Sequence, residues 1–272
     1  MKKIKRTVIC LLVVSTVLMA VFTGYDRMRR DEEKPVITCP ETVLETSVSV
    51  TEEALLAGVS ASDSRDGEVD VVVEKLSPVD DAHQRTVTYA AADSAGNVSR
   101  ATRTLQYTDY HPPRFQMTGA PRATTAEGPY ALIGKIRASD VTGRDLSGRI
   151  RFGTLDSRMA NEQGIHLLEL RVTDAFGFNQ VLPIEVDVYD PAGENIRVEL
   201  KEYLIYLPLN GTLDAAAYFL ESSQPGTLQV ESDVNSAVPG VYYVDYTVRG
   251  ETENSIGRSR MVVVVEQEGG RS

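Results

Sequence analysis

Two distant stretches of this chain follow one plan, and their spacing limits what the chain can fold into. In Thr86–Thr108, side chains alternate with a period of two on either side of the turn Asp93–Asn97. Alternation of β-branched and aromatic residues predicts two half-buried strands, and Asp, Gly and Asn predict the turn. The plan returns 81 residues later in His166–Asp190, around Asp174, and more loosely in Pro239–Glu266. A fixed period of about 80 residues predicts tandem β domains rather than one large fold.

The alternation also predicts which side chains of each hairpin share a face. In the first hairpin these are Val87, Tyr89 and Ala91, followed on the return strand by Ala101, Arg103, Leu105 and Tyr107. In the second they are Leu168, Leu170 and Val172, followed by Leu182, Ile184, Val186 and Val188.

The charge of the chain excludes several classes of partner. The 272 residues carry a net charge of −11, and from residue 31 onward 21 Lys and Arg face 38 Asp and Glu. An acidic body repels phosphate backbones and anionic lipid headgroups. We therefore expect no nucleic-acid partner, and we expect the body not to lie on a membrane surface.

The N-terminal segment has the pattern of a membrane anchor. Residues 1–6 are rich in Lys and Arg, and Thr7–Tyr25 follows with 19 uncharged residues, about 28 Å as a helix. A cleaved signal peptide is the alternative, but Leu18 or Phe22 would occupy a position that prefers a small residue. We expect a single-pass signal anchor in contact with the lipid bilayer, with the N-terminus in the cytoplasm and the body outside.

Two proline-containing junctions, at His111-Pro112-Pro113 and at Asp190-Pro191, divide the body. The predicted segments are a cytoplasmic basic segment (1–6), a transmembrane anchor (7–25), a stem (26–34), three domains (35–109, 110–190 and 191–266) and a polar tail (267–272). Within the first domain, Thr51–Gly58 has a Thr N-cap, two early acids and a final Gly, which predict a short helix. Cys10 and Cys39 lie too far apart to form a disulfide, and Cys39 is expected as a small buried residue.

The residues that recur in the first domain resemble a known family. Ala61-Ser62-Asp63, Asp66-Gly67 and Val87–Asn97 are similar to bacterial immunoglobulin-like domains of the HYR and DUF5011 (Cry22-like) type, which read A-x-D-x-x-D-G and then Y-x-A-x-D-x-x-G-N. The similarity is good over 35–109, fair over 110–190 and weak over 191–266. It implies an immunoglobulin-like sandwich for each repeat. The predicted fold class is therefore all-β, with three tandem Ig-like antiparallel β-sandwiches preceded by one transmembrane helix.

Candidate chemistry is concentrated in one acidic loop. Asp63, Asp66, Glu68 and Asp70 lie close together in sequence, and Asp93 is expected at the same end of the domain. Oxygen ligands of this kind suit Ca²⁺, but the spacing lacks the ligand series of an EF-hand. The other interpretation is that Asp63 and Asp93 cap turns while the other acids of the loop face water. We adopt this second interpretation. The second domain keeps the turn acids, Asp140 and Asp174, but has fewer of the remaining acids.

Other candidate groups give no recognisable site. His83, His111 and His166 lack zinc-ligand spacing, and no nucleophile elbow or phosphate loop is present in the sequence. We therefore predict a protein that is not an enzyme and assign no catalytic, cofactor or metal residue.

A tyrosine cluster in the third domain suggests a platform for sugar or protein. Its members are Tyr203, Tyr206, Tyr242, Tyr243 and Tyr246. Alternation places Tyr242 and Tyr246 with the core residues Val244 and Val248, so we expect Tyr243, on the other face, to be exposed.

These features predict a membrane-anchored bacterial surface protein. Its Ig-like modules would act as spacer and adhesion or interaction domains for an extracellular protein or glycan. The alternative is a non-enzymatic accessory subunit of a cell-envelope assembly, such as secretion, pilus or wall machinery.

Overall fold

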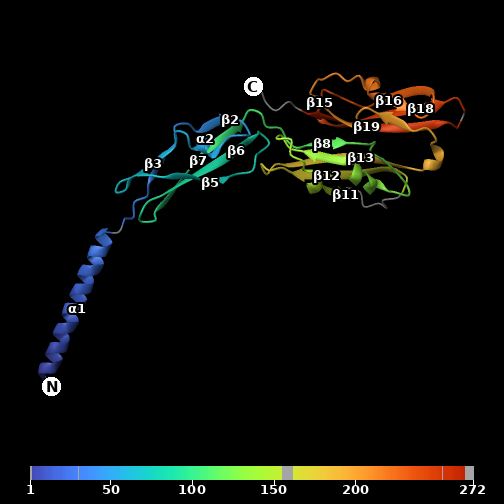
Figure 1. Cartoon of the computed structure of the whole chain (residues 1–272). Coiled ribbons are helices and arrows are strands. Elements are labelled where there is room, and N and C mark those ends of the chain that lie inside the picture. The colour runs from blue at the N-terminus through green and yellow to red at the C-terminus, as the bar shows by residue number, and fades with distance from the viewer. Residues whose placement is uncertain (1, 30, 155–161, 253, 267–272) are drawn as a thin grey trace. The chain divides into compact units, whose positions relative to one another are not determined.

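The protein folds into two compact units, as seen in a computed structural model (Figure 1). The structure describes residues 2–29, 31–154, 162–252 and 254–266, without the side chains of residues 2–10, 26–29 and 154. The predicted tail 267–272 and the side chains of the basic segment and of Cys10 therefore lie outside the described residues. The first unit contains the residues up to Ser77 and Thr86–Gln106, and the second contains Pro78–Arg85 and the residues from Tyr107 onward.

The first unit contains two helices and two β-sheets. The helices are α1 (Lys2–Arg29) and α2 (Glu52–Leu56). The strands that lie wholly or mainly in this unit are β1 (Val36–Thr38), β2 (Val43–Thr46), β3 (Ser60–Asp63), β4 (Gly67–Val69), β5 (Val71–Leu76), β6 (Gln84–Ala92) and β7 (Val98–Tyr107). They form a three-stranded sheet, β1-β3-β4, and a four-stranded sheet, β2-β7-β6-β5.

The predicted hairpin of the first unit is confirmed. Val87, Tyr89 and Leu105 are fully buried and form the core with Leu55 of α2. The Tyr89 hydroxyl donates a hydrogen bond of 2.7 Å to the carbonyl oxygen of Leu55, which ties the helix to the sheet. Because a buried hydroxyl needs a partner, this bond also satisfies Tyr89.

The short helix of this unit also follows the sequence, whereas Cys39, expected to be buried, is only partly so. Thr51 caps α2 by accepting a hydrogen bond from the Ala54 amide at 3.3 Å, and Gly58 has the positive φ of 74° expected after a helix. Cys39 is a free thiol, half-buried against the core.

The second unit contains twelve strands in four sheets among its described residues. The strands are β8 (Arg114–Met117), β9 (Arg122–Thr124), β10 (Ile136–Ser139), β11 (Arg151–Thr154), β12 (Gly164–Thr173), β13 (Asn179–Tyr189), β14 (Val198–Leu200), β15 (Leu204–Pro208), β16 (Phe219–Ser222), β17 (Gly226–Ser232), β18 (Gly240–Gly250) and β19 (Ile256–Glu266). Four 3₁₀ turns connect them: η1 (Pro129–Lys135), η2 (Ser147–Arg149), η3 (Pro191–Gly193) and η4 (Ala215–Tyr218). The sheets are β10-β8, β11-β12-β13-β9, β14-β16 and β15-β19-β18-β17.

The two later hairpins of the sequence are also confirmed as strand pairs. The β12–β13 pair is antiparallel from Gly164–Val188 to Thr173–Asn179, and its predicted core-facing residues are buried. Strands β18 and β19 pair in the same way from Gly240–Val265 to Arg249–Ile256. The chain is therefore a mainly β protein made of several sheets.

The sheet β15-β19-β18-β17 is covered on both faces, and it joins the two halves of the second unit (Figure 1). On one face, Val244, Tyr246 and Val263 belong to the core formed by residues 196–265. On the other face, Tyr243 and Val262 belong to the core of the preceding residues 115–188. The expectation that Tyr243 is exposed was wrong, because a second sandwich covers that face and leaves the residue 9% exposed.

Two tyrosine hydroxyls of this sheet satisfy backbone amides of the neighbouring sandwich. The Tyr206 hydroxyl accepts a hydrogen bond of 2.8 Å from the Phe115 amide in β8, and the Tyr243 hydroxyl accepts one of 2.6 Å from the Glu185 amide in β13. Amides at a sheet edge need a partner when they are buried. Two residues of the predicted tyrosine platform, Tyr206 and Tyr243, thus make contacts within the second unit.

The apolar N-terminal segment is helical, as α1. Among the residues whose side chains are described, no helix is both long and apolar enough to cross a bilayer.

Replacing Tyr206 with Phe tests the contact between the two sandwiches. The change leaves the Phe115 amide buried without an acceptor, and we expect the free energy of unfolding of the second unit to fall by about 1–3 kcal/mol. Urea denaturation of the full chain measures this. Tyr242→Phe is the control, because its hydroxyl donates to Val238 in a solvent-exposed bond; we expect a change below about 0.5 kcal/mol. Equal effects of the two variants would contradict the account.

Candidate functional site

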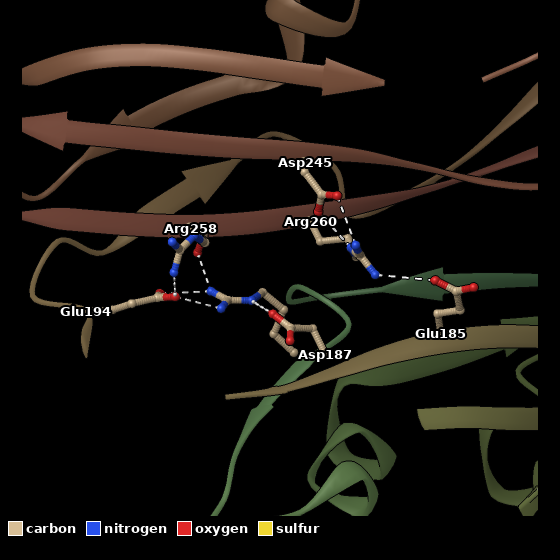
Figure 2. Close-up of polar contacts among 7 residues, drawn as sticks. Glu185, Asp187, Glu194, Asp245, Arg258 and Arg260 are labelled. Atoms are coloured by element: carbon tan, nitrogen blue, oxygen red, sulfur yellow. Dashed lines mark hydrogen bonds and ion pairs between the residues drawn. The ribbon is translucent and has the colours of Figure 1, made fainter. Parts of the chain in front are cut away.

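Arg122 is the centre of a buried ion-pair network in the second unit. Figure 2 labels its partners Asp187, Glu194 and Arg258. Its Nε donates to Asp187 at 2.7 Å, and its two terminal nitrogens donate to Glu194 at 2.7 and 2.9 Å. Its Nη1 also donates to the carbonyl oxygen of Arg258 at 2.8 Å, and its guanidinium lies 4.0 Å from the centre of the Tyr189 ring. This one side chain therefore joins β9, β13, the junction at Glu194 and β19.

Burial and hydrogen bonding act in opposite directions on these groups. Burial alone would raise the pKa of Glu194, but hydrogen bonds and charge from Arg122, and then from Arg258, hold that pKa below its usual range. For Arg122, burial alone would lower the pKa. Its hydrogen bonds to Glu194 and Asp187 outweigh burial, so the pKa of Arg122 is raised. The hydrogen bonds thus favour the charged forms of both groups, and the network links β9, β13 and β19.

A second arginine bridges the same two sandwiches (Figure 2). Arg260 makes a bidentate contact with Asp245 at 2.7 and 2.9 Å and an ion pair with Glu185 at 3.5 Å. Its guanidinium lies 5.0 Å from the centre of the Tyr243 ring. A polar cleft of about 700 Å³ opens beside Arg122 and is also lined by Lys135 and Arg197.

In the first unit, three carboxylates converge. Asp31, Asp63 and Asp93 each offer an oxygen atom, and these atoms lie within 4.8 Å of one another. Asp63 and Asp93 are each 8% exposed. Asp63 is the last residue of β3 and Asp93 directly follows β6, whereas Asp31 lies in the stem after α1. This set of hard oxygen ligands is of the kind that holds a metal ion.

Hydrogen bonds hold the three acids in position. Asp63 Oδ1 accepts the amides of Arg65 and Asp66 at 2.8 and 3.1 Å. Asn97 donates its side-chain amide to Asp93 at 2.7 Å and to the carbonyl oxygen of Asp31 at 3.1 Å. Burial alone would raise the pKa of Asp93, but these bonds from Asn97 and the bonds from neighbouring backbone amides lower it.

The sequence identified only part of this cluster. Asp63 and Asp93 do cap turns, as predicted, and they also approach each other as expected. Asp66 instead accepts the Ser94 amide at 2.6 Å, and Glu68 and Asp70 are exposed and outside the cluster. Asp31 was missed, because its distance of 32 residues from Asp63 gives no sequence signal; an acid directly before the first strand was the available clue.

The second unit repeats the two turn aspartates, but its third group differs and Phe178 stands at the position of Asn97. Asp140 and Asp174 occupy the positions of Asp63 and Asp93, and both are buried. The third group is Tyr110, whose hydroxyl donates to Asp174 at 2.8 Å. Burial first, and then this bond and the charges of Asp174 and Asp140, raise the pKa of Tyr110. Here a hydroxyl stands where the first unit has a carboxylate.

The histidines are not brought together. His83 packs edge-on against Tyr110, His111 Nδ1 lies 2.8 Å from the Pro112 carbonyl, and His166 Nε2 lies 2.6 Å from the Glu162 carbonyl.

Comparison with known proteins assigns this chain to no family. No protein-family model matches the chain, and no curated protein matches its sequence. Among solved structures, it is similar to Drosophila N-cadherin EC1–3, at 9% identity over 84% of this chain and 99% of that one, with a TM-score of 0.27. It is also similar to mouse cadherin-23 EC22–24, at 12% identity over 87% of this chain and 100% of that one, with a TM-score of 0.20.

A third similar structure is the protocadherin γB4 extracellular domain, at 11% identity over 85% of this chain, with a TM-score of 0.19. This chain spans about half of that one, 49%. TM-scores this low support no argument about this chain.

Replacing Arg122 with Met tests whether the buried network holds the second unit together. The variant leaves Glu194 and Asp187 without their main partner, and removal of one side of a buried pair costs about 3–5 kcal/mol of unfolding free energy. Urea denaturation measures the loss. Arg197→Met is the matched control, because its pair with Glu199 is exposed and should cost less than about 1 kcal/mol. A loss for Arg122→Met no greater than for the control would contradict the prediction.

The lowered pKa of Glu194 predicts a pH dependence. A carboxylate with a depressed pKa in the folded state stabilises fully above its unfolded pKa, about 4.3, and this stability is lost as pH falls through the folded value. The difference in unfolding free energy between the wild type and Glu194→Gln should therefore be largest near pH 7 and shrink below about pH 4.3. Urea denaturation at a series of pH values checks this, and a difference that grows in acid would refute it.

Proposed function

We propose that this chain is a membrane-anchored surface protein of a bacterium whose β modules act as spacer and interaction domains. Its N-terminus would lie in the cytoplasm, and the modules would lie outside and meet a protein or glycan partner. The observation that carries this proposal is the exposed apolar surface of α1, which directly precedes an acidic β body.

The described part of α1 presents apolar side chains to its surroundings on all sides. They are 55–70% exposed, and they comprise Leu11, Leu12, Val13, Val14, Val17, Leu18, Met19, Val21, Phe22 and Tyr25. A helix that is apolar all round is stable when it is buried in a core or in lipid. Because the sequence from Thr7 to Tyr25 has no charge, lipid is the environment that suits it.

A spacer needs neighbouring modules that are held in fixed positions relative to each other. In the second unit, the Arg122 network and the Tyr206 and Tyr243 hydroxyls fix one sandwich to the next. This arrangement supports a role in which the two sandwiches are presented as one rigid body.

Interaction sites of such a protein would lie on its open sheet edges. Strand β17 ends the sheet β15-β19-β18-β17, and β5 ends the sheet β2-β7-β6-β5 in the described structure. An open edge can accept a strand from a partner. Val72 of β5 is 54% exposed and offers an apolar contact beside that edge.

We propose that the protein is not an enzyme. The three histidines contact backbone carbonyls or an aromatic ring, and Arg122 and Arg260 are engaged in structural ion pairs.

Membrane extraction tests the anchor. We expect the wild-type chain to stay in the membrane pellet at pH 11, and external protease to digest its body in intact spheroplasts. The double variant Leu12→Arg, Leu18→Arg should move to the supernatant, because a charge at the centre of a membrane helix costs about 2.5–3.5 kcal/mol. Val238→Arg, at an exposed position of the body, is the control and should stay in the pellet. A wild-type chain found in the cytosol would overturn the proposal.

Exchange of residues 1–25 for an unrelated anchor separates the two roles considered above. A surface spacer and interaction protein should keep its partner in pull-downs after the exchange, whereas an accessory subunit that binds through the helix should lose its complex.

A further inference from the structure

The first unit brings three largely buried carboxylates together at one point. Asp63 and Asp93 are each 8% exposed, and the side chain of Asp31 is 10% exposed. Their oxygens lie within 4.8 Å of one another. Among the side chains that the structure describes, Arg65 forms an ion pair here: its Nε lies 3.4 Å from Asp31, and its side chain is 51% exposed. Like charges brought together away from water repel strongly, so three carboxylates beside one exposed guanidinium call for a further positive charge.

A second observation points to the same place. Asp63 Oδ1 accepts two backbone amides, but Asp63 Oδ2 is buried and has no hydrogen-bond partner among the described residues. Burial of a carboxylate oxygen without a partner is costly. A turn cap needs only Oδ1, so capping does not explain why the other oxygen of Asp63 is buried beside two further acids.

We propose that Asp31, Asp63 and Asp93 bind a divalent cation, with Ca²⁺ preferred over Mg²⁺. All three ligands are carboxylate oxygens, which excludes the nitrogen and sulfur set typical of zinc. Three oxygens within 4.8 Å fit on a sphere of Ca–O bond length, about 2.3–2.6 Å. Mg²⁺ usually keeps several waters and takes one or two protein carboxylates, whereas Ca²⁺ accepts more carboxylates in flexible geometry.

The ion would fasten the stem to the first β-sandwich. Asp31 lies in the stem, while Asp63 and Asp93 end two strands of different sheets. Without an ion, Asp31 is held by the Asn97 bond to its carbonyl, by the Arg65 ion pair and by the bond that its side chain accepts from the Glu33 amide. Binding of Ca²⁺ therefore orders residue 31 and stabilises the first unit, because the ion binds only the folded arrangement.

The second unit provides an internal comparison. There Tyr110 donates a hydrogen bond to Asp174 and replaces the third carboxylate. A neutral hydroxyl removes one negative charge and supplies a donor, so this copy needs no cation to hold its third group. The inference is thus specific to the first unit, although Asp140 Oδ2 is also buried there without a described partner.

Calorimetric titration of the full chain in detergent, after EDTA treatment, tests the proposal. We expect one saturable Ca²⁺ site, weaker Mg²⁺ binding, and a higher melting temperature of the first unit in millimolar Ca²⁺ than in EDTA. Asp31→Asn should weaken Ca²⁺ binding at least tenfold. This variant should fold, since Asn keeps the oxygen that accepts the Glu33 amide. Asp63→Asn should also weaken binding, and Asp140→Asn, at the matching position of the second unit, should leave it unchanged.

Three results would each overturn the proposal. They are no heat and no melting shift at 10 mM Ca²⁺, undiminished binding in Asp31→Asn, or Mg²⁺ binding as tight as Ca²⁺ binding. The titration does not depend on whether α1 spans a membrane, so its failure and the failure of the anchor are distinguishable.

Discussion

The second unit depends on one sheet, β15-β19-β18-β17, that is buried on both faces. Its strands supply Val244 and Tyr246 to one core and Tyr243 and Val262 to the other, so neither core is complete without it. The polar groups at the boundary follow from this burial. Once the sheet covers the neighbouring sandwich, exposed amides and charges there lose water and need partners inside the protein. Tyr206, Arg122 and Arg260 supply these partners.

The same constraint limits where a partner molecule can bind. Part of the tyrosine cluster, together with Arg122 and Arg260 of the second unit, is used for internal contacts and is not free to bind a partner. The two copies of the aspartate turn then differ in an informative way. In the second unit a hydroxyl completes it, while in the first unit Asp31 completes it and adds charge. The chain thus keeps the two turn aspartates in both units and surrounds them with different chemistry.

Much of the local fold could be predicted from the sequence because period-two patterns are local. The hairpin residues Val87, Leu170 and Ile184 are buried as the alternation indicates, and Gly96 and Gly177 take the positive φ that the turns need. Contacts between distant segments were not predictable. Alternation shows that Tyr243 faces away from Tyr246, but not that another sandwich covers that side. The uninterrupted run Met261–Val265 was the available signal, since strands buried on both faces lose their polar alternation. Asp31 was missed for the same reason: its partners are distant in sequence.

Native-state hydrogen exchange, read strand by strand, tests the central claim most directly. If the doubly covered sheet joins both cores into one cooperative unit, the slowest amides of β12 and β13 should exchange with the same opening free energy as those of β18 and β19. Their exchange should also respond to denaturant with the same slope. If β12 and β13 open at a distinctly lower free energy while β18 and β19 stay protected, the two sandwiches fold independently, and this account of the second unit is wrong.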